Sequence, residues 1–170
     1  MGLGRWCWQL VGKGGKSTRI VVAYQPCKSN KNLRGFTTCE QHERYFQPRE
    51  DFCSPRTIFY EQLVSQLILW KSAGEEIILC GNFNKNVYDS RIGWRLAQPD
   101  LLMKEQCLLK TGERLPNTFI TETRPIDGVF ANTGIEDMDA DLLPKYGGIS
   151  DHRAFILKFY HCISSWHVVS

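Results

Sequence analysis

Two side-chain amides follow a short apolar segment near the middle of the chain. The β-branched run 77–79 is followed by Cys80 and Gly81, and then by Asn82 and Asn84. A short run of this kind is typical of a buried strand, and the loop after such a strand is where open α/β sheets bind ligands. We therefore expect Asn82 and Asn84 to lie at a polar site that other elements complete.

Two carboxylates and a histidine occur later in the chain. Asp127 interrupts the otherwise apolar segment 126–131, where an unpaired charge would be costly. Asp151 and His152 stand side by side just before the last apolar run. Each has an ordinary structural explanation, because Asp127 could accept backbone hydrogen bonds and Asp151-His152 could turn a hairpin. An Asp–His pair would instead fix the tautomer of the imidazole and raise its basicity.

Strands and helices alternate in the part of the chain that must position these residues. Periodicity and turn residues predict strands at 4–11, 18–24, 76–80, 117–121, 126–131, 138–143 and 154–160. They predict helices at 54–72, 89–96 and 100–109, the first of them begun by Ser54-Pro55. The first two strands are expected to form a hairpin, and strand 20–24, helix 54–72 and strand 77–80 form an α/β crossover pattern. The predicted class is therefore α/β.

The segment 28–56 is long and polar, with at most a helical turn around 40–46. Loops of this length in compact domains tend to be functional or disordered. Cys27, Cys39, His42 and Cys53 could in principle chelate zinc, but their spacing fits no standard zinc finger. The seven cysteines of the chain are odd in number and irregularly spaced, so we expect free thiols.

Length and charge limit the classes of protein to consider. The 170 residues suit one domain, which we place at 1–160, with 161–170 as a tail. No segment is apolar enough to cross a bilayer and the first residues lack the apolar core of a signal peptide, so an intracellular location without membrane contact is expected. Residues 1–56 carry ten Lys/Arg against four Asp/Glu, whereas the remainder carries eleven against fourteen. This asymmetry fits a polyanion-binding surface, or simply a solvated basic loop.

Four motifs in this order resemble those of the endonuclease/exonuclease/phosphatase superfamily. They are Ala23-Tyr24-Gln25-Pro26 after a β-branched strand, Gly81-Asn82-Phe83-Asn84, Ile126-Asp127, and Ser150-Asp151-His152. The resemblance is strongest to the endonuclease domains of retroelements, and it extends from Trp6 to Tyr160. It implies a four-layer α/β/β/α sandwich and a divalent-metal-dependent phosphodiester hydrolase that acts on nucleic acid, most readily DNA through the basic segment 1–56.

The resemblance also implies a role for each matching residue. Tyr24 is similar to the tyrosine that hydrogen-bonds the scissile phosphate, and Asn84 to the asparagine beside the attacking water. His152 is similar to the histidine that contacts the phosphate, oriented by the carboxylate that Asp127 resembles. Asp151 is similar to the carboxylate next to the Mg²⁺ or Mn²⁺ site. Such groups suit phosphodiester hydrolysis, because charge that develops on the phosphoryl oxygens must be neutralised.

Two departures from the family pattern weaken the predicted activity. Asn82 stands where the family has the aspartate that deprotonates water, and an amide is a poor base near neutral pH. The family's N-terminal strands, with an early asparagine and the metal-binding glutamate, have no counterpart before Gly4. The ion would then be bound weakly if at all, and the incomplete sandwich would expose sheet surface, Trp6 and Trp8 included, to self-association or to a missing N-terminal segment.

Three interpretations therefore stay open. The chain is a nuclease-like hydrolase with weak or absent activity, or a non-catalytic module that binds phosphate or nucleic acid, or a non-functional fragment of a mobile-element reading frame. Which phosphoester would be the substrate is not encoded in any motif of this sequence.

Overall fold

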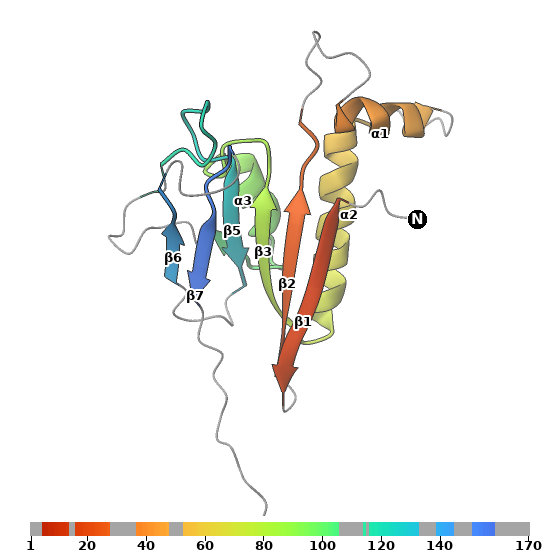
Figure 1. The fold of residues 1–170 in the computed structure, drawn as a ribbon. Helices are drawn as coiled ribbons and strands as arrows, with labels where there is room; N and C mark the ends of the chain where they lie inside the picture. The colour runs from red at the N-terminus through yellow and green to blue at the C-terminus, as the bar shows by residue number, and fades with distance from the viewer. Residues whose placement is uncertain are drawn as a thin grey trace, which may run out of the picture.

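A five-stranded mixed sheet runs through the computed structural model of the chain (Figure 1). The structure describes residues 5–13, 16–27, 37–47, 53–105, 114, 116–132, 139–144 and 151–158. The order of the sheet is β1-β2-β3-β5-β4, and a separate two-stranded sheet consists of β6 and β7. The strands are β1 (Trp6–Lys13), β2 (Lys16–Tyr24), β3 (Glu76–Asn82), β4 (Lys104–Glu105), β5 (Asp127–Ala131), β6 (Asp139–Leu142) and β7 (Phe155–Lys158). The helices are α1 (Thr38–Phe46), α2 (Pro55–Ser72) and α3 (Ser90–Leu96).

The hairpin and the crossover that the sequence predicts are both present. β1 and β2 pair antiparallel, with Trp6 opposite Ala23. β2 and β3 pair in parallel, and the chain between them passes through α1 and α2. Parallel neighbours require such a crossover, which delivers the carboxyl ends of both strands to the same edge of the sheet.

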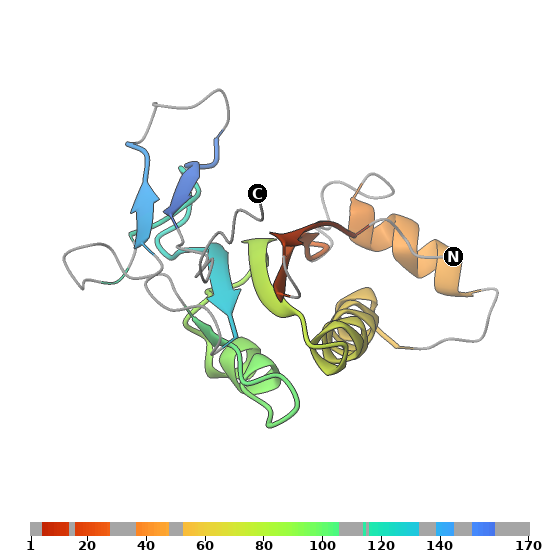
Figure 2. The same cartoon turned by 90° about the horizontal axis from the view of Figure 1, so that it is seen from below.

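Helices α2 and α3 cover one face of the large sheet (Figure 2). Ser54 begins α2 as predicted, because its side chain accepts a hydrogen bond from the backbone N–H of Thr57 and Pro55 occupies the first turn. Every second residue of β2 and β3 packs beneath the two helices. The largest fully buried side chains of this layer are Phe59, Leu63, Leu67, Ile77, Leu79, Phe83, Ile92, Leu96 and Phe130.

The small sheet β6–β7 packs on the opposite face of the large sheet. Ile78 and Val129, from β3 and β5, form a second core with Leu142, Phe155 and Leu157. The described residues therefore form helix, sheet and sheet layers. This arrangement confirms the predicted α/β class and the incomplete sandwich architecture.

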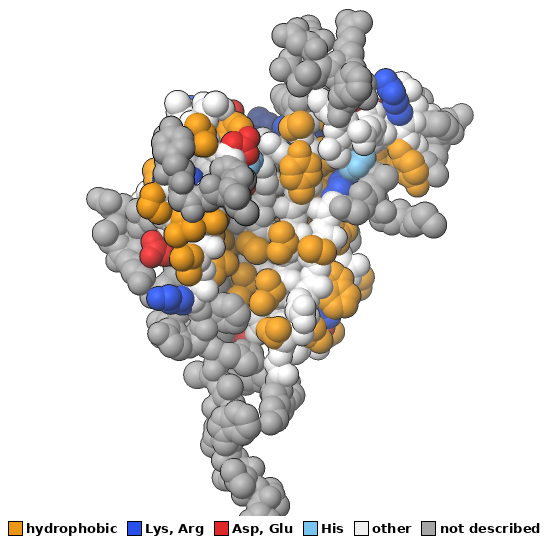
Figure 3. All heavy atoms as spheres, in the orientation of Figure 1, with side chains coloured by type: hydrophobic (Ala, Val, Ile, Leu, Met, Phe, Trp, Pro, Cys, Tyr) orange, Lys and Arg blue, Asp and Glu red, His pale blue; other side chains and the backbone are white. Residues whose placement is uncertain are grey.

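The small sheet covers only part of that face of the large sheet, and it leaves the part formed by β1 and β2 exposed. Val22 retains 48% of its surface and Tyr24 retains 40%, and Cys7 opposite Val22 is also exposed. Figure 3, which views this face, shows hydrophobic side chains gathered over the middle of the sheet. Trp8 is 53% exposed, as predicted, but it lies on the helix face, where its ring packs edge-on against Trp70.

Trp6 does not behave as an exposed side chain. It is only partly exposed, and its ring contacts Phe59 of α2 edge-on at 6.0 Å between centroids. The exposed sheet surface is thus formed by the alternate residues of β1 and β2, on the other face.

Residues 100–105 do not form the predicted helix. Leu102 has φ 51°, a left-handed conformation that a helix cannot contain, and Lys104 pairs with Ala131 at the edge of the sheet. Leu101 and Met103 are buried while Leu102 is exposed. Residues 106–109 of that prediction lie outside the described residues.

The predicted strand 117–121 is reduced to one bridge, between Phe119 and His152, because the chain turns again at 120–121. In the polar segment 28–56, the expected turn around 40–46 is a full helix, α1, with a capping box between Thr37 and Glu40.

The cysteines in the described ranges are free thiols, as predicted, namely Cys7, Cys27, Cys39, Cys53 and Cys80. Cys107 and Cys162 lie outside those ranges. The four candidate zinc ligands are all described, and no group of three or more His, Cys, Asp or Glu side chains suited to a metal gathers among the described residues. None of the helices seen here combines the length and apolarity that crossing a membrane requires.

Candidate active site

Three of the predicted site residues lie in one row across the large sheet. Tyr24 of β2 is the register partner of Asn82 of β3, and Asn82 is the partner of Asp127 of β5. Directly opposed residues on neighbouring strands project from the same face. These three side chains therefore share the face that also packs against β6 and β7, at the end of the sheet where β2 and β3 finish.

His152 is bound to the end of this row. Its Nδ1 lies 2.9 Å from Oδ2 of Asp127, and Asp127 is 9% exposed. A carboxylate at this distance accepts the Nδ1 hydrogen, so it fixes both the tautomer and the orientation of the ring. The other ring nitrogen, Nε2, is then the atom with which His152 can contact a ligand. The ring of Phe119 packs against the His152 ring, with 4.7 Å between the two ring centroids.

Thr118 holds the two segments of the Asp–His pair together. Its hydroxyl oxygen accepts hydrogen bonds from the backbone N–H groups of Ile126 and Asp127, at 3.0 and 3.1 Å. Its carbonyl accepts the N–H of Arg153 at 2.8 Å. Thr118 is fully buried, and sequence reasoning did not single it out, since a threonine in an apparent strand gives no sign of such a role.

The loop after β3 is shaped by its two amides. Oδ1 of Asn82 accepts the backbone N–H of Asn84 at 2.7 Å, and Asn84 adopts φ 46°, which asparagine tolerates better than most residues. Nδ2 of Asn84 donates to the carbonyl of Gln25 at 2.6 Å. These bonds tie the loop after β3 to the segment after β2.

Gly81 allows the two strands to approach closely. It has φ 145°, and a Cβ built on it would lie 1.9 Å from the carbonyl oxygen of Ala23. A side chain at this position would push β3 away from β2 and would break the row at Asn82.

Tyr24 stands at the exposed end of the row. Burial, followed by the neighbouring Cys27 thiol, raises the pKa of Tyr24 above its ordinary value of 10.0. The phenol therefore stays protonated at neutral pH, where it can donate a hydrogen bond to an anion.

The structure does not bring Asp151 into this group through its side chain. Asp151 is exposed, and its backbone carbonyl accepts the N–H of Ile120 at 3.0 Å. Within the described residues no three His, Cys, Asp or Glu side chains gather, and the oxygen of Asn82 is engaged by its own loop. This donor set does not fit a divalent metal, which takes several carboxylate oxygens.

The fold has relatives among solved structures. It resembles the human Nocturnin catalytic domain, with a TM-score of 0.56 and 18% identity, over 91% of this chain and 53% of that one. It also resembles the 3′ phosphatase NExo from Neisseria, with a TM-score of 0.53 and 14% identity, over 85% of this chain and 62% of that one. This chain has the endonuclease/exonuclease/phosphatase fold. No protein-family model and no curated protein matches the sequence.

The resemblance that the motifs indicated is thus confirmed for the endonuclease/exonuclease/phosphatase fold. The chain spans between about half and two thirds of the length of the two structures it resembles. At such low identities the likeness concerns the fold, so the chemistry must be argued from this chain's own residues.

Proposed function

We propose that this chain is a phosphodiester-hydrolase-like domain that binds a phosphodiester at the row of Tyr24, Asn82 and Asp127 and hydrolyses it slowly. The observation that supports the proposal most is the Asp127–His152 pair, 2.9 Å apart at the end of the row. With Nδ1 engaged by Asp127, Nε2 is the atom of His152 that would contact a phosphoryl oxygen, and the protonated phenol of Tyr24 would donate to another. Asn84 would hold the loop beside the attacking water.

Slow hydrolysis follows from the residue at position 82. In the attack on phosphorus, water must lose a proton as the new P–O bond forms and the ester P–O bond breaks. Asn82 cannot accept that proton, so the proton passes to bulk water and the leaving oxygen takes up a proton from solvent. The absence of a general base typically costs about 10²–10⁴-fold in rate. Its amide keeps the shape of the loop instead, as the hydrogen bond to Asn84 indicates.

Weak binding of Mg²⁺ or Mn²⁺, if any, belongs to this proposal. The described residues do not fit a metal site, and Asp151 is the one carboxylate proposed to adjoin an ion. We therefore expect such an ion to bind loosely, and no step of the proposed chemistry depends on it.

Nucleic acid, most readily DNA, is the proposed substrate class. Nocturnin was solved with a bound sulfate anion, and NExo is a 3′ phosphatase solved with product DNA. The basic segment 1–56 supports contact with a polyanion, but two of its arginines do not belong to that surface. Arg5 is 3% exposed and donates to the carbonyl of Pro55, and Arg19 is 6% exposed and pairs with Glu75. A retroelement-type nuclease is the finer form of this proposal, and it rests on the motifs alone.

The binding step can be tested without turnover. Isothermal titration of the dinucleotide dTpdT should give measurable affinity for the wild-type chain, at least about tenfold weaker affinity for His152→Ala, and an intermediate loss for Tyr24→Phe. Lys104→Gln is a matched control, because Lys104 is exposed on β4 and belongs neither to the row nor to the segment 1–56. Unchanged affinity in His152→Ala would overturn the proposal.

A non-catalytic binding module is the second candidate function. Asn82, together with a donor set that does not fit a metal, favours it. DNA retention that survives His152→Ala, with no detectable turnover in the wild type, would support this alternative over slow hydrolysis.

A further inference from the structure

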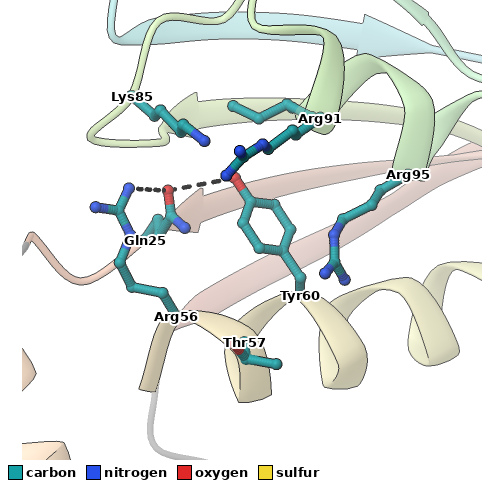
Figure 4. Close-up of a pocket in the computed structure, with 8 residues that line it drawn as sticks. Gln25, Arg56, Thr57, Tyr60, Lys85, Arg91 and Arg95 are labelled. Carbon is teal, nitrogen blue, oxygen red and sulfur yellow. Dashed lines mark hydrogen bonds between the residues drawn. The ribbon is translucent and has the colours of Figure 1, made fainter. Parts of the chain in front are cut away.

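Four cationic side chains converge on a pocket away from the row of Tyr24, Asn82 and Asp127 (Figure 4). Arg56 comes from the first turn of α2, Lys85 from the loop after β3, and Arg91 and Arg95 from α3. The pocket has a volume of about 270 Å³ and is also lined by Gln25, Thr57, Tyr60 and Ile92.

The charge in this pocket is poorly compensated. Asp89 lies 3.3 Å from Lys85 and also accepts the backbone N–H of Arg91, which lowers the pKa of its carboxyl. Among the described carboxylates none forms an ion pair with Arg56, Arg91 or Arg95. Like charges that share one pocket repel one another, and a bound anion would relieve that repulsion.

The neutral groups of the pocket hold the cations in place. Oε1 of Gln25, whose side chain is buried, accepts from Arg56 at 2.9 Å and from the hydroxyl of Tyr60 at 3.3 Å. Burial raises the pKa of Tyr60 to about 12, so its hydroxyl remains a donor at neutral pH. The guanidinium of Arg95 lies over the Tyr60 ring, 5.3 Å from its centroid. Gln25 and Tyr60 thus position Arg56 and Arg95 before any ligand arrives.

The chemistry of the lining selects the ligand class. Guanidinium groups pair with phosphate oxygens in a bidentate manner, and lysine adds a point charge. A pocket of about 270 Å³ lies below the range that accommodates drug-sized ligands, so it suits a phosphate or a diphosphate more than a whole nucleotide. We propose that this pocket is a second binding site, for a phosphoryl group, formed by Arg56, Lys85, Arg91 and Arg95.

The site is connected to the candidate active site without sharing its chemistry. Arg56 also donates to the carbonyl of Asn84 at 3.0 Å, and the carbonyl of Gln25 accepts from the side chain of Asn84. A phosphoryl group bound by Arg56 would therefore lie behind the loop of Asn82 and Asn84. The phosphoryl group could come from a small anion such as pyrophosphate, or from the backbone of a nucleic acid that extends past the row.

Inorganic pyrophosphate, titrated calorimetrically at constant ionic strength, tests the proposal. We expect Arg91→Gln/Arg95→Gln to weaken binding at least about tenfold. The control Lys104→Gln/Lys158→Gln removes the same charge from exposed positions on β4 and β7 and should change the affinity less than about twofold. Absence of binding by the wild type, or equal losses in both double variants, would overturn the proposal.

Two single variants separate loss of the pocket from loss of folding and from loss of the active site. Arg91→Gln alone, at an exposed side chain, should keep the circular dichroism and the Tm of the wild type while it weakens pyrophosphate binding. His152→Ala should retain pyrophosphate binding at this pocket, so failure of the active-site proposal would not imply failure of this one. A ten-residue oligothymidylate identifies the source: loss of its affinity in Arg91→Gln/Arg95→Gln indicates backbone phosphate, and unchanged affinity indicates a small anion.

Discussion

Gly81 is the residue on which the geometry of the candidate site depends most. Its missing side chain lets the carbonyl of Ala23 approach, and its φ of 145° disfavours any other residue. Because β2 and β3 lie this close, Asn82 can join the row and Asn84 can reach the carbonyl of Gln25.

We expect Gly81→Ala to lower the free energy of unfolding by more than about 2 kcal/mol, through steric conflict and backbone strain. Gly93→Ala is the matched control, because a Cβ there would meet nothing within 4 Å and the position lies within α3. That variant should raise the free energy of unfolding by up to about 1 kcal/mol. Urea denaturation measures both, and a harmless Gly81→Ala would show that the strands do not approach as described.

Asn82 is the residue that limits the proposed chemistry. Asn82→Asp would supply a base, and its carboxylate could still accept the N–H of Asn84. We expect this change to raise kcat/KM for a nitrophenyl phosphodiester. The gain should fall short of the roughly 10²–10⁴-fold that a general base can contribute. It is limited because the described residues do not fit a metal site. A rise to the upper end of that range would mean that the rest of the active site, including its metal, is complete.

At the scale of elements, the turn at 117–126 positions the Asp–His pair. Asp127 and His152 belong to different segments, and the single bridge at Phe119 together with Thr118 brings the segments into contact. A bond between residues so far apart in sequence has no periodic signal, so Asp127 and His152 could be paired from the sequence only through a family resemblance.

Thr118→Val should cost about 1–3 kcal/mol of unfolding free energy, because it leaves the buried N–H of Asp127 and the partly buried N–H of Ile126 without their acceptor at nearly constant volume. Thr121→Val, at an exposed position in the same turn, should change it by less than about 0.5 kcal/mol. Equal effects of the two substitutions in chemical denaturation would contradict the role assigned to Thr118.

Two helices predicted from sequence patterns, at 54–72 and 100–109, had different outcomes. Ser54-Pro55 predicted the start of α2 correctly because the cap and the proline act locally. The segment 100–109 contains helix-forming residues, yet Leu102 is left-handed and Lys104 pairs at the sheet edge with β5. Tertiary pairing determined the conformation of residues 100–105, and no local property of these residues indicated the outcome.

At the scale of the whole molecule, the small sheet covers only part of the large one. The family resemblance implied two packed sheets, but it could not indicate which strands would remain uncovered. The exposed face over β1 and β2 includes Val22 and Cys7. Exposed sheet surfaces favour association, so self-association through this face stays a prediction, beside the alternative that a further segment covers it.

Sedimentation velocity tests this prediction. Val22→Lys should shift the chain toward monomer at micromolar concentrations, because it places a charge within the contact. Leu69→Lys, at a side chain 64% exposed on α2, should leave the distribution unchanged. A wild-type chain that sediments as a monomer at all concentrations would rule the association out.

Nicking of supercoiled plasmid DNA tests two properties of the chain at once, namely the phosphodiester site and its impaired hydrolysis. We expect the purified chain to nick DNA slowly in the presence of Mg²⁺, and His152→Ala to abolish that slow activity. The double variant Lys104→Gln/Lys158→Gln, at exposed positions outside the segment 1–56, should nick DNA at the wild-type rate. Rapid turnover that His152→Ala abolishes would contradict the impairment assigned to Asn82, and slow turnover that survives His152→Ala would contradict the site itself.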